Sequence, residues 1–575
     1  MSSYPRRRIL PISRDEFSRL LQRTIPPPGW LRNLGVANSG GADSTCLLFL
    51  LHRFLRDSAS TEFTSPRVIM SMTVDHDLQP TSSAMAAHCA RVADRLGIEH
   101  LTTKITWGEG KYPPRPEPGQ SMENIARSAR YRALFEVMKR SRVDILALGH
   151  HADDQVETSL MRLGRGSTEY GAGGMRPIRR WGMGMGREGD TGYFGYEGMN
   201  KWMIRPLLSV SKERILATCE TNKLEFVTDE TNFQPALTLR NAIRHVLNPD
   251  PNKQSMPELP PDIAEKLEQT NKAVSSLESV VVNIQSGPDQ LRGAVQLLNN
   301  QVRDTDEQVD YALKRCIHPS PNGTLILLSR HLAAFKDPLL QVAMVIRIIR
   351  YISFYPWGST RGDALRRSDS LKLIVKTLWQ ANPLISRSGS FTAGGGVLWT
   401  PVLVRGHRIR TPDPRHAVPA QADEQPGWIV SRMPQPRAEK MRQMGITVDP
   451  LHRDVTPLFK DVFEKRRQGQ VHKTLRVLYD NRYLVQFDLE RIPMDLLMTF
   501  SDSASQEKIL LLPNSRWFYP KVVRTRTNGK HETIQTKLEP IDEQLSLSLP
   551  PWKVSENGIA SDWITIKWIR TLEAI

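Results

Sequence analysis

Apolar runs and amphipathic segments alternate along residues 34–163. Short apolar runs that fit buried strands lie at residues 34–37, 68–74, 98–105 and 144–148. Around them, apolar residues recur at helical spacing and predict helices at residues 45–56, 83–96, 122–140 and 153–163. Strands that alternate with helices favour a parallel sheet with right-handed crossovers. The pattern therefore predicts an α/β domain built on a Rossmann-like parallel sheet.

The pattern changes on either side of this segment. A short helix is predicted at residues 14–22, and residues 176–200 are rich in glycine, so we expect an irregular insertion there. From Ile263 to Ile284 apolar residues recur at spacings of four and three, which indicates one packed helix capped by Asp262. Another helix should begin at Asp337. We divide the chain into an N-terminal extension (1–30), the α/β domain (31–248), a helical region (249–356) and a C-terminal mixed α+β region (357–575).

The chain is strongly basic, with 78 Lys and Arg residues against 61 Asp and Glu residues and a net charge of +17. Such an excess is typical of proteins that bind polyanions, because Lys and Arg neutralise phosphates. A basic surface without a nucleic-acid partner would explain the charge equally well. The four cysteines form no Cys-x-x-Cys pair, which argues against a zinc ribbon and a disulfide framework. No apolar run has the length of a membrane span, so we expect no membrane partner; the oligomeric state stays open.

The segment Ser39-Gly40-Gly41-Ala42-Asp43-Ser44 separates the first predicted strand from the helix that follows. Glycines let the backbone approach a phosphate closely, and the helix offers free amides and the positive end of its dipole. Ser39 and Ser44 add hydroxyl donors, and Asp43 fits there if it holds Mg²⁺ against a pyrophosphate. We interpret this segment as a pyrophosphate-binding loop. The alternative is a glycine-rich turn with a helix cap, and the Gly-Lys-Ser/Thr of a Walker A loop is absent.

A second cluster of polar residues, Gly149–Thr158, follows the predicted strand at 144–148. Asp154 and Glu157 lie three positions apart and share one face of the predicted helix, where two carboxylates suit an ammonium group or a metal. The alternative is that the aspartates only complement the helix dipole. Two adjacent histidines, His150 and His151, favour a functional role.

Arginines form a third group of candidates. Arg127 and Arg130 lie one helical turn apart and suit phosphates. Arg205 opens an Arg-Pro-Leu-Leu segment, and Arg240 to Arg244 form an Arg-Asn-Ala-Ile-Arg segment suited to phosphate and base contacts. Taken alone, Arg127 and Arg130 favour a solvated basic helix face, and the other two segments are equally compatible with a surface helix.

The loop at 39–44 resembles that of the N-type ATP pyrophosphatases, which cleave ATP to AMP and pyrophosphate. Taken in order, the motifs resemble the tRNA(Ile)-lysidine synthetase family over roughly residues 30–248. Besides the loop, the matching segments are Val74–Leu78, Ala126–Tyr131, His150–Thr158, Arg165–Ser167, Arg205–Leu208 and Arg240–Arg244. The chain departs from the family at Asp77, where a glycine is usual, and matches it only loosely at Gly171–Met175.

The resemblance implies an adenine nucleotide alpha hydrolase-like PP-loop domain that uses ATP and Mg²⁺. Its substrates would be L-lysine and an isoleucine tRNA with the anticodon CAU. ATP would adenylate the wobble cytidine, and lysine would then replace AMP at C2 to give lysidine. The implied catalytic residues are Asp43, Arg130, His150, Asp154 and Glu157. Those implied for ATP are Ser39, Gly40, Gly41, Ala42, Asp43, Ser44 and His76, with Asp43 on the metal; those for tRNA are Arg205, Arg240, Asn241 and Arg244.

Particular roles follow from the same resemblance. Arg130 would neutralise charge near the α-phosphate, and Asp154 and Glu157 would bind the lysine ammonium. His150, with a pKa near the operating pH, would assist removal of the amine proton. The C-terminal region is a candidate for tRNA binding.

Two rival functions remain open. A tRNA thiolase of the same fold is disfavoured because no cysteine pair is present. A non-catalytic tRNA-binding protein is disfavoured because the loop and the His150–Thr158 segment are intact. Arg6, Arg7, Arg8 and Arg14 suggest a mitochondrial presequence, although Asp15 and Glu16 follow; the cytoplasm is the alternative location.

Overall fold

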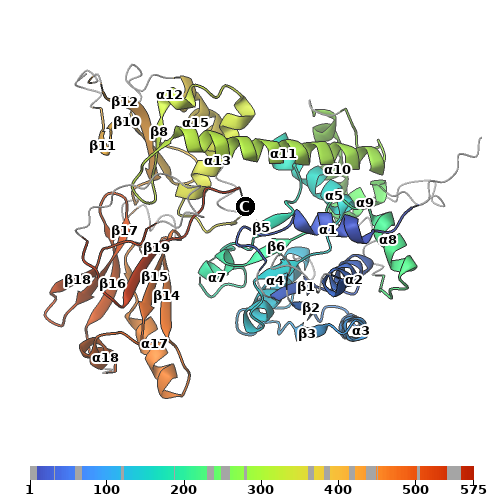
Figure 1. Cartoon of the computed structure of the whole chain (residues 1–575), viewed down its shortest axis with the longest axis horizontal. Coiled ribbons are helices and arrows are strands. Elements are labelled where there is room, and N and C mark those ends of the chain that lie inside the picture. The colour runs from blue at the N-terminus through green and yellow to red at the C-terminus, as the bar shows by residue number, and fades with distance from the viewer. Residues whose placement is uncertain are drawn as a thin grey trace, which may run out of the picture. The chain divides into compact units, whose positions relative to one another are not determined.

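The computed structural model divides the chain into two compact units, Met1–Asp304 and Thr305–Ala574, each described here by itself (Figure 1). The residues that it describes are 9–30, 33–57, 66, 68–117, 122–186, 188–228, 238–247, 259–277, 281–359, 368–380, 389–412, 421, 423–435, 439, 449, 451–501, 505–540 and 558–574.

A six-stranded sheet in the order β3-β2-β1-β4-β6-β5 forms the centre of the first unit. The strands are β1 (Asn33–Ala37), β2 (Val68–Asp75), β3 (Glu99–Lys104), β4 (Ile145–Ala147), β5 (Ile178–Arg180) and β6 (Trp202–Ile204). All neighbouring pairs are parallel except β5 with β6, which is antiparallel. The predicted Rossmann-like parallel sheet is therefore confirmed, with an antiparallel strand added at one edge.

Helices pack on both faces of this sheet, because each strand has apolar side chains on both sides. On β4, Ile145 and Ala147 lie in one core cluster and Leu146 lies in the other. The first cluster includes residues of α1 (Arg14–Gln22), α2 (Ala42–Asp57), α3 (Ser82–Arg95) and α8 (Lys212–Thr221). The second includes Phe135 and Met138 of α4 (Met122–Arg140).

The glycine-rich segment 176–200 is more ordered than expected. It contains β5, a bridge between Gly184 and Tyr193, and helix α7 (Gly195–Met199). Trp181 and Phe194 pack edge to face with ring centroids 5.4 Å apart, and both contact the ring of Phe135. Most of the described segment is still irregular in its backbone, and the aromatic contacts with α4, far away in the sequence, hold it in place.

The helical segments after the sheet also differ from the prediction. Helix α10 runs from Pro261 to Ser275 and has Pro260, not Asp262, at its N-cap; α11 runs from Pro288 to Cys316. Ile284 lies between the two helices and is buried. The apolar residues from Ile263 to Ile284 therefore do not belong to one helix, contrary to the prediction from their spacing. The remaining helices of the unit are α5 (Ala152–Leu163), α6 (Glu169–Ala172) and α9 (Leu239–Leu247).

The second unit contains three antiparallel sheets and several helices, which confirms the mixed α+β structure expected there. The first sheet has the order β11-β10-β12-β8-β7, with β9 beside β10; the others are β13-β16-β17-β18 and β14-β15-β19. The strands of the first sheet are β7 (Ile317–His318), β8 (Leu325–Leu328), β9 (Phe391–Thr392), β10 (Val397–Arg405), β11 (Arg408–Arg410) and β12 (Gln425–Arg432). Those of the others are β13 (Arg453–Asp454), β14 (Thr474–Tyr479), β15 (Tyr483–Asp488), β16 (Lys508–Asn514), β17 (Tyr519–Thr525), β18 (His531–Gln535) and β19 (Ile564–Trp568).

The helices of this unit are α12 (Ser329–Leu332), α13 (Pro338–Ile352), α15 (Ser368–Gln380), α17 (Thr456–Arg467) and α18 (Met494–Ser501). Asp337 caps α13 by accepting a hydrogen bond from the Leu339 amide, as expected. The proposed division into four regions stays a prediction, but the two compact units part inside the region expected to be helical, where β7 and β8 already belong to the sheet of β10 and β12. In the described chain, no helix is both long and apolar enough to cross a membrane.

Candidate active site at the carboxyl ends of the parallel strands

The segment after β1 is held by Asn38, a buried residue that the sequence prediction missed. Its side-chain oxygen accepts hydrogen bonds from the Gly40 amide (3.1 Å) and the Ser44 hydroxyl (3.3 Å). Its side-chain nitrogen donates to the Ser71 hydroxyl on β2 at 3.2 Å. The sequence signal that could have identified Asn38 is a polar residue directly after a buried strand. Asn38 fixes the loop to both strands.

The loop itself has the form of a phosphate cradle. Gly40 has a φ of +80°, and a side chain there would lie 3.1 Å from the Cys89 sulfur. At Gly41 an added Cβ would meet no atom closer than 3.9 Å, so the space in front of this residue is open. Ala42 begins α2, whose first amides have no carbonyl one turn earlier within the helix. Ser39 and Ser44 lie together, with their hydroxyl oxygens 3.2 Å apart.

Gly149 brings the second predicted cluster to this loop. A Cβ at Gly149 would lie 2.9 Å from the carbonyl carbon of Asp43 and 3.0 Å from the Ser44 amide nitrogen. The end of β4 therefore touches the first turn of α2 backbone to backbone. The two motifs are more than one hundred residues apart in sequence, and the parallel sheet makes them neighbours.

Asp43 faces two cations or potential cations. Lys212, the first residue of α8, has its Nζ 2.6 Å from one carboxylate oxygen of Asp43, and the Nε2 of His151 lies 3.6 Å from the same oxygen. The Asp43 side chain is 32% exposed, so it remains accessible to a ligand. Lys212 was missed by sequence reasoning, because nothing in its local sequence links it to the loop.

His151 caps α5. Its Nδ1 accepts a hydrogen bond from the Asp153 amide at 3.2 Å, and the Asp154 carboxylate accepts one from the His151 amide at 3.0 Å. Burial by itself would lower the pKa of His151, but the carboxylates of Asp154, Asp153 and Asp43 outweigh it and raise the pKa. The residues at the start of α5 therefore do cap the helix. The same cap places the imidazole of His151 beside Asp43.

Asp153 fastens this cap to two later helices. It accepts hydrogen bonds from the Arg292 guanidinium of α11 (2.5 Å) and the Lys212 amide (3.0 Å). Arg292 also donates to Glu213 at 2.9 Å. Although burial opposes it, His151 and Arg292 together hold the pKa of Asp153 well below its usual range. A fixed ion pair thus joins α5, α8 and α11 below the loop.

His150 differs from the expectation of a pKa near the operating pH. Burial and the neighbouring Arg205 guanidinium lower the pKa of His150 to about 3. Its Nδ1 is buried and has no hydrogen-bond partner within the described chain. His150 is therefore a neutral imidazole at neutral pH, and His151 is the more basic of the two histidines.

Glu157 is paired with two arginines from α9. Arg244 donates to both carboxylate oxygens, at 2.8 and 3.1 Å, and the Nε of Arg240 lies 3.3 Å from one of them. The Glu157 side chain is buried, so these arginines hold the positions that a lysine ammonium would need. Asn241 donates from its backbone amide to Thr238. Glu157, Arg240 and Arg244 are thus brought together, in a different pairing from the one predicted.

Arg205 lies buried at the end of β6. One of its terminal nitrogens donates to the Arg176 carbonyl at 2.9 Å, and its Nε has no partner in the part of the chain that the structure describes. Burial and the nearby Arg179 lower the pKa of Arg205 to about 10. A buried guanidinium with cationic neighbours suits an anion. Arg130 lies on α4, where its side chain is exposed.

His76 follows β2 and contacts the Ser82 hydroxyl at the start of α3, at 3.0 Å. Its carbonyl accepts a hydrogen bond from the Trp107 indole at 2.9 Å. The next residue, Asp77, has a φ of +51°, the left-handed conformation that favours glycine. This conformation explains why glycine is usual at that position in the family that the sequence resembles.

The residues of the loop fit ATP with Mg²⁺. The described residues contain no cluster of three or more His, Cys, Asp and Glu side chains arranged to hold a metal by themselves. Mg²⁺ needs no such cluster, because it is commonly held by one or two carboxylates together with substrate phosphates. Asp43 is the partly exposed carboxylate of the loop and would be the ligand for such an ion.

The comparisons with known proteins agree with this geometry. Residues 14–251 match the family model described as a PP-loop domain. The tRNA(Ile)-lysidine synthase of Methylobacterium nodulans is 34% identical over 238 residues, which cover 41% of this chain and 59% of that protein. That of Bacillus subtilis is 31% identical over 254 residues, covering 43% and 46%. The chain spans about half the length of the curated relatives it matches.

Solved structures resemble the chain only weakly overall. A U34-tRNA thiolase from Methanococcus maripaludis has a TM-score of 0.31 at 14% identity and covers 50% of this chain and 78% of its own. An NH3-dependent NAD synthetase from Campylobacter jejuni has a TM-score of 0.24 at 14% identity, covering 46% and 93%. Within the first unit, residues 14–251 match the PP-loop domain model, and the sheet has a Rossmann-like parallel arrangement.

Proposed function

We propose that this chain joins lysine to C2 of the wobble cytidine of an isoleucine tRNA with the anticodon CAU, at the expense of ATP. The observation that carries the proposal is the backbone contact at Gly149, which sets the His150–Glu157 segment directly beside the phosphate cradle. Relatives named tRNA(Ile)-lysidine synthase support it, since they are 34% and 31% identical to this chain over 238 and 254 residues. The net charge of +17 suits a large polyanionic substrate.

The first step adenylates the cytidine. Its C2 oxygen attacks the α-phosphorus of ATP, the bond to the bridging oxygen breaks, and pyrophosphate leaves. Ser39–Ser44 would hold the departing pyrophosphate with amide and hydroxyl donors. Bound Mg²⁺ would neutralise part of its charge, with Asp43 as the ligand from this chain. The Nζ of Lys212 lies 2.6 Å from Asp43. In the proposal it would stabilise the negative charge that develops on the leaving pyrophosphate.

The second step forms the bond to lysine. The ε-amine attacks C2, AMP leaves, and the amine loses a proton. We propose that Asp154 receives the ammonium group of the incoming lysine, and that Glu157 shares this role once Arg244 has moved from it. His150, neutral at neutral pH, accepts a hydrogen bond from the amine, and His151 with its raised pKa takes up the proton.

The remaining predicted residues act on phosphates in this proposal. Arg130 neutralises charge near the α-phosphate, and Arg205, Arg240, Asn241 and Arg244 contact the tRNA. His76, at the end of the neighbouring strand β2, contributes to ATP binding. The unpaired Nε of the buried Arg205 is the structural feature that favours an anion at this place.

Replacement of Asp43 by Ala tests the proposal. We expect AMP release that depends on both tRNA and lysine in the unaltered chain, and its loss by at least a hundredfold in Asp43→Ala. Asp94→Ala, on the exposed face of α3, is the matched control and should behave as the unaltered chain. Mass spectrometry of the tRNA after incubation with ATP and labelled lysine identifies the product. ATP–pyrophosphate exchange that survives Asp43→Ala would show the assignment to be wrong.

We also propose a mitochondrial location, on the basis of the arginines near the start of the chain. Arg6, Arg7 and Arg8 lie outside the described residues, whereas Arg14 begins α1 and pairs with Asp57 of α2. Ile12, Phe17 and Leu21 are buried in the core, so a removable segment would have to end before residue 12. Imaging of a C-terminal fluorescent fusion distinguishes mitochondria from cytoplasm.

A further inference from the structure

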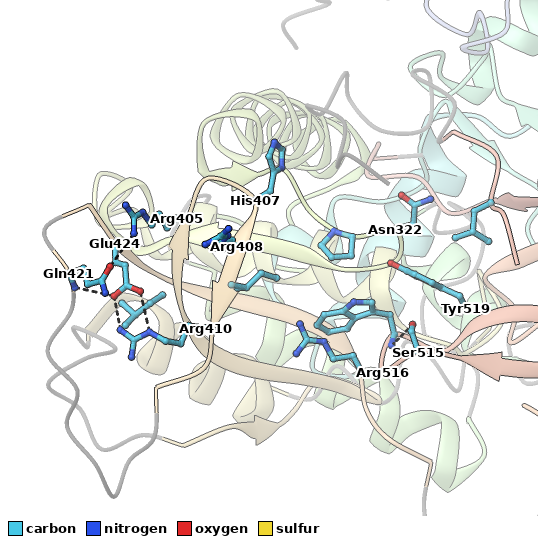
Figure 2. A pocket seen from close by; sticks show the side chains of 15 residues that line it. Asn322, Arg405, His407, Arg408, Arg410, Gln421, Glu424, Ser515, Arg516 and Tyr519 are labelled. Atoms are coloured by element: carbon cyan, nitrogen blue, oxygen red, sulfur yellow. Dashed lines mark hydrogen bonds and ion pairs between the residues drawn. The ribbon is translucent and has the colours of Figure 1, made fainter. Parts of the chain in front are cut away.

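A cavity of about 830 Å³ lies within the second unit, between the β10–β11 hairpin and the turn that joins β16 to β17 (Figure 2). Its size lies in the range of pockets that hold small organic ligands. Asn322 and Tyr519 line it together with residues of the two hairpins. No residue of the adenylation site described above belongs to it.

Four arginines line the cavity, and their pairing differs from one to the next. Arg410 donates two hydrogen bonds to the carboxylate of Glu424, at 3.1 and 2.6 Å, and Arg405 pairs with Asp423. Figure 2 shows Arg410, Glu424 and Gln421 grouped at one end of the cavity. The charge of this end is therefore largely neutralised.

The other two arginines, Arg408 and Arg516, carry uncompensated charge. Both are exposed, and no ion pair joins either of them to a carboxylate in the part of the chain that the structure describes. They come from different hairpins, Arg408 from β11 and Arg516 from the turn before β17 (Figure 2). Two guanidinium groups that face one cavity from separate elements suit a phosphate group, which each can bind through paired N–H donors.

An aromatic surface lies next to this charge. The Arg516 guanidinium lies 4.2 Å from the centre of the Trp517 ring, and Trp517 packs against the apolar cluster around Ile326 and Val402. The Trp517 side chain is only partly buried, so part of its indole remains available. The guanidinium lies over the indole ring, and the Arg516 side chain is itself exposed, so the two form a stacked pair. The planar outer face of such a guanidinium is a stacking platform for a nucleobase.

We propose that this cavity binds one unpaired nucleotide of an RNA strand, with its base stacked on the Arg516–Trp517 pair and its phosphodiester bound by the N–H donors of Arg408 and Arg516. This proposal rests on the proposed function in one respect: the RNA that occupies the cavity is taken to be the tRNA substrate. An acidic peptide would pair with the arginines but would leave no planar group stacked on the Arg516–Trp517 pair. A free nucleotide has the same chemistry, and the experiment below separates the two sources.

The test measures the affinity of the full-length chain for transcribed isoleucine tRNA with the anticodon CAU, at several salt concentrations. The double variant Arg408→Gln/Arg516→Gln should bind this tRNA about tenfold more weakly or worse, because hydrogen bonds to a charged phosphate are lost. The slope of log K against log salt should fall by about 0.7, the value for one phosphate of a single strand. The rate of lysine-dependent AMP release at saturating tRNA should not change.

The matched control is Arg476→Gln/Arg491→Gln, which removes the same charge from exposed positions on β14 and just after β15. It should bind tRNA with nearly unchanged affinity. Trp517→Leu keeps an apolar side chain on the cluster but removes the ring, and should weaken binding about tenfold without changing the salt slope. A melting temperature equal to that of the unaltered chain shows that these variants are folded.

A second measurement locates the RNA directly. Irradiation of tRNA that carries 4-thiouridine, followed by mass spectrometry, should give cross-links to the peptide that contains Trp517. Unchanged tRNA affinity in both the arginine and the tryptophan variants would overturn the proposal. Loss of a second AMP-binding site in the arginine variant, while tRNA binding and the AMP site at Ser39–Ser44 are kept, would also overturn it and make the cavity a free-nucleotide site.

The outcomes of this test and of the proposed reaction can be told apart. Weaker tRNA binding by the arginine variant in a chain that forms no lysidine supports the RNA site and contradicts only the proposed reaction. Normal lysidine formation together with unchanged tRNA binding contradicts only the RNA site.

Discussion

Gly149 lies where the end of β4 meets the first turn of α2, and its surroundings leave no room for a methyl group. Gly149→Ala should lower the free energy of unfolding by about 1–3 kcal/mol, because a Cβ would overlap the backbone of Asp43. ATP–pyrophosphate exchange should fall at least tenfold, since the loop must shift to relieve the overlap. Gly293→Ala on α11, where an added Cβ meets nothing within 4 Å, is the control and should be neutral or slightly stabilising.

The lowered pKa of His150 predicts a pH effect on stability. An unfolded histidine has a pKa of about 6.5, so below that pH the unfolded chain binds a proton that the folded His150, with a pKa of about 3, does not. Folding is therefore weakened as the pH falls from 6.5 towards 3, and the effect is absent above pH 7. We expect the free energy of unfolding, measured in urea, to fall between pH 7.5 and pH 5.5 in the unaltered chain. In His150→Gln the fall over the same interval should be smaller by about 1 kcal/mol. Equal losses in the two proteins would contradict the buried, neutral state of His150.

Residues of the site that stand within one motif could be predicted from the sequence, and their long-range partners could not. Ser39–Ser44 were recognisable because glycines and a helix start determine a phosphate cradle locally. Lys212 is 169 positions from Asp43, and Arg292 is 139 positions from Asp153. Such pairs depend on how helices pack, on which a single sequence carries no local signal. The same packing gave His150 a low pKa and gave Glu157 arginine partners.

At the scale of elements, Arg292 is the main ionic link between α11 and the helices beside the loop. Its guanidinium pairs with Asp153 of α5 and Glu213 of α8, and its side chain is 14% exposed. Arg292→Gln should destabilise the chain by about 3 kcal/mol, because it leaves the Asp153 carboxylate buried without this partner. Arg303→Gln, at an exposed position of the same helix, should have little effect.

The Arg292→Gln effect should depend on pH in a defined direction. Because the folded pKa of Asp153 is lowered, its contribution is fully present above the unfolded value of about 3.9 and is lost as the pH falls below it. Melting temperatures measured from pH 3 to pH 8 should therefore differ most between variant and unaltered chain above about pH 4 and converge below it. A gap that widens on acidification would contradict the ion pair.

Elements with a strong local pattern were predicted well. The helices at 14–22 and 122–140 have the predicted bounds, and the four predicted strands of the sheet are present within a few residues. The prediction of one helix from Ile263 to Ile284 was wrong, because apolar residues can be buried without belonging to one continuous helix. Ile284 lies in a turn, where the Asn283 amide donates a hydrogen bond to the Ser286 hydroxyl, and its side chain is nevertheless buried. The short strand β5 was missed because only its pairing with β6 identifies it.

At the scale of the whole molecule, the net charge of +17 predicts a steep salt dependence of tRNA binding. Each phosphate contact releases counterions, and a protein with six to ten contacts loses about 10³–10⁵ in affinity between 50 and 200 mM salt. We expect at least a hundredfold loss over that range for the full-length chain, measured by filter binding. An affinity that does not change with salt would contradict a polyanionic substrate.

The ion pair between Asp43 and Lys212 also has a consequence for biosynthesis. The ribosome makes the phosphate cradle 169 residues before the lysine that faces its carboxylate, and before the strand β6 that precedes α8. A nascent chain that stops short of β6 carries the complete loop without Lys212, and it also lacks both contacts to later helices that hold Asp153. The ionic cluster around Asp43 and Asp153 is therefore complete only after α8 and α11 have been made, and a truncated product of translation carries the motif without this cluster.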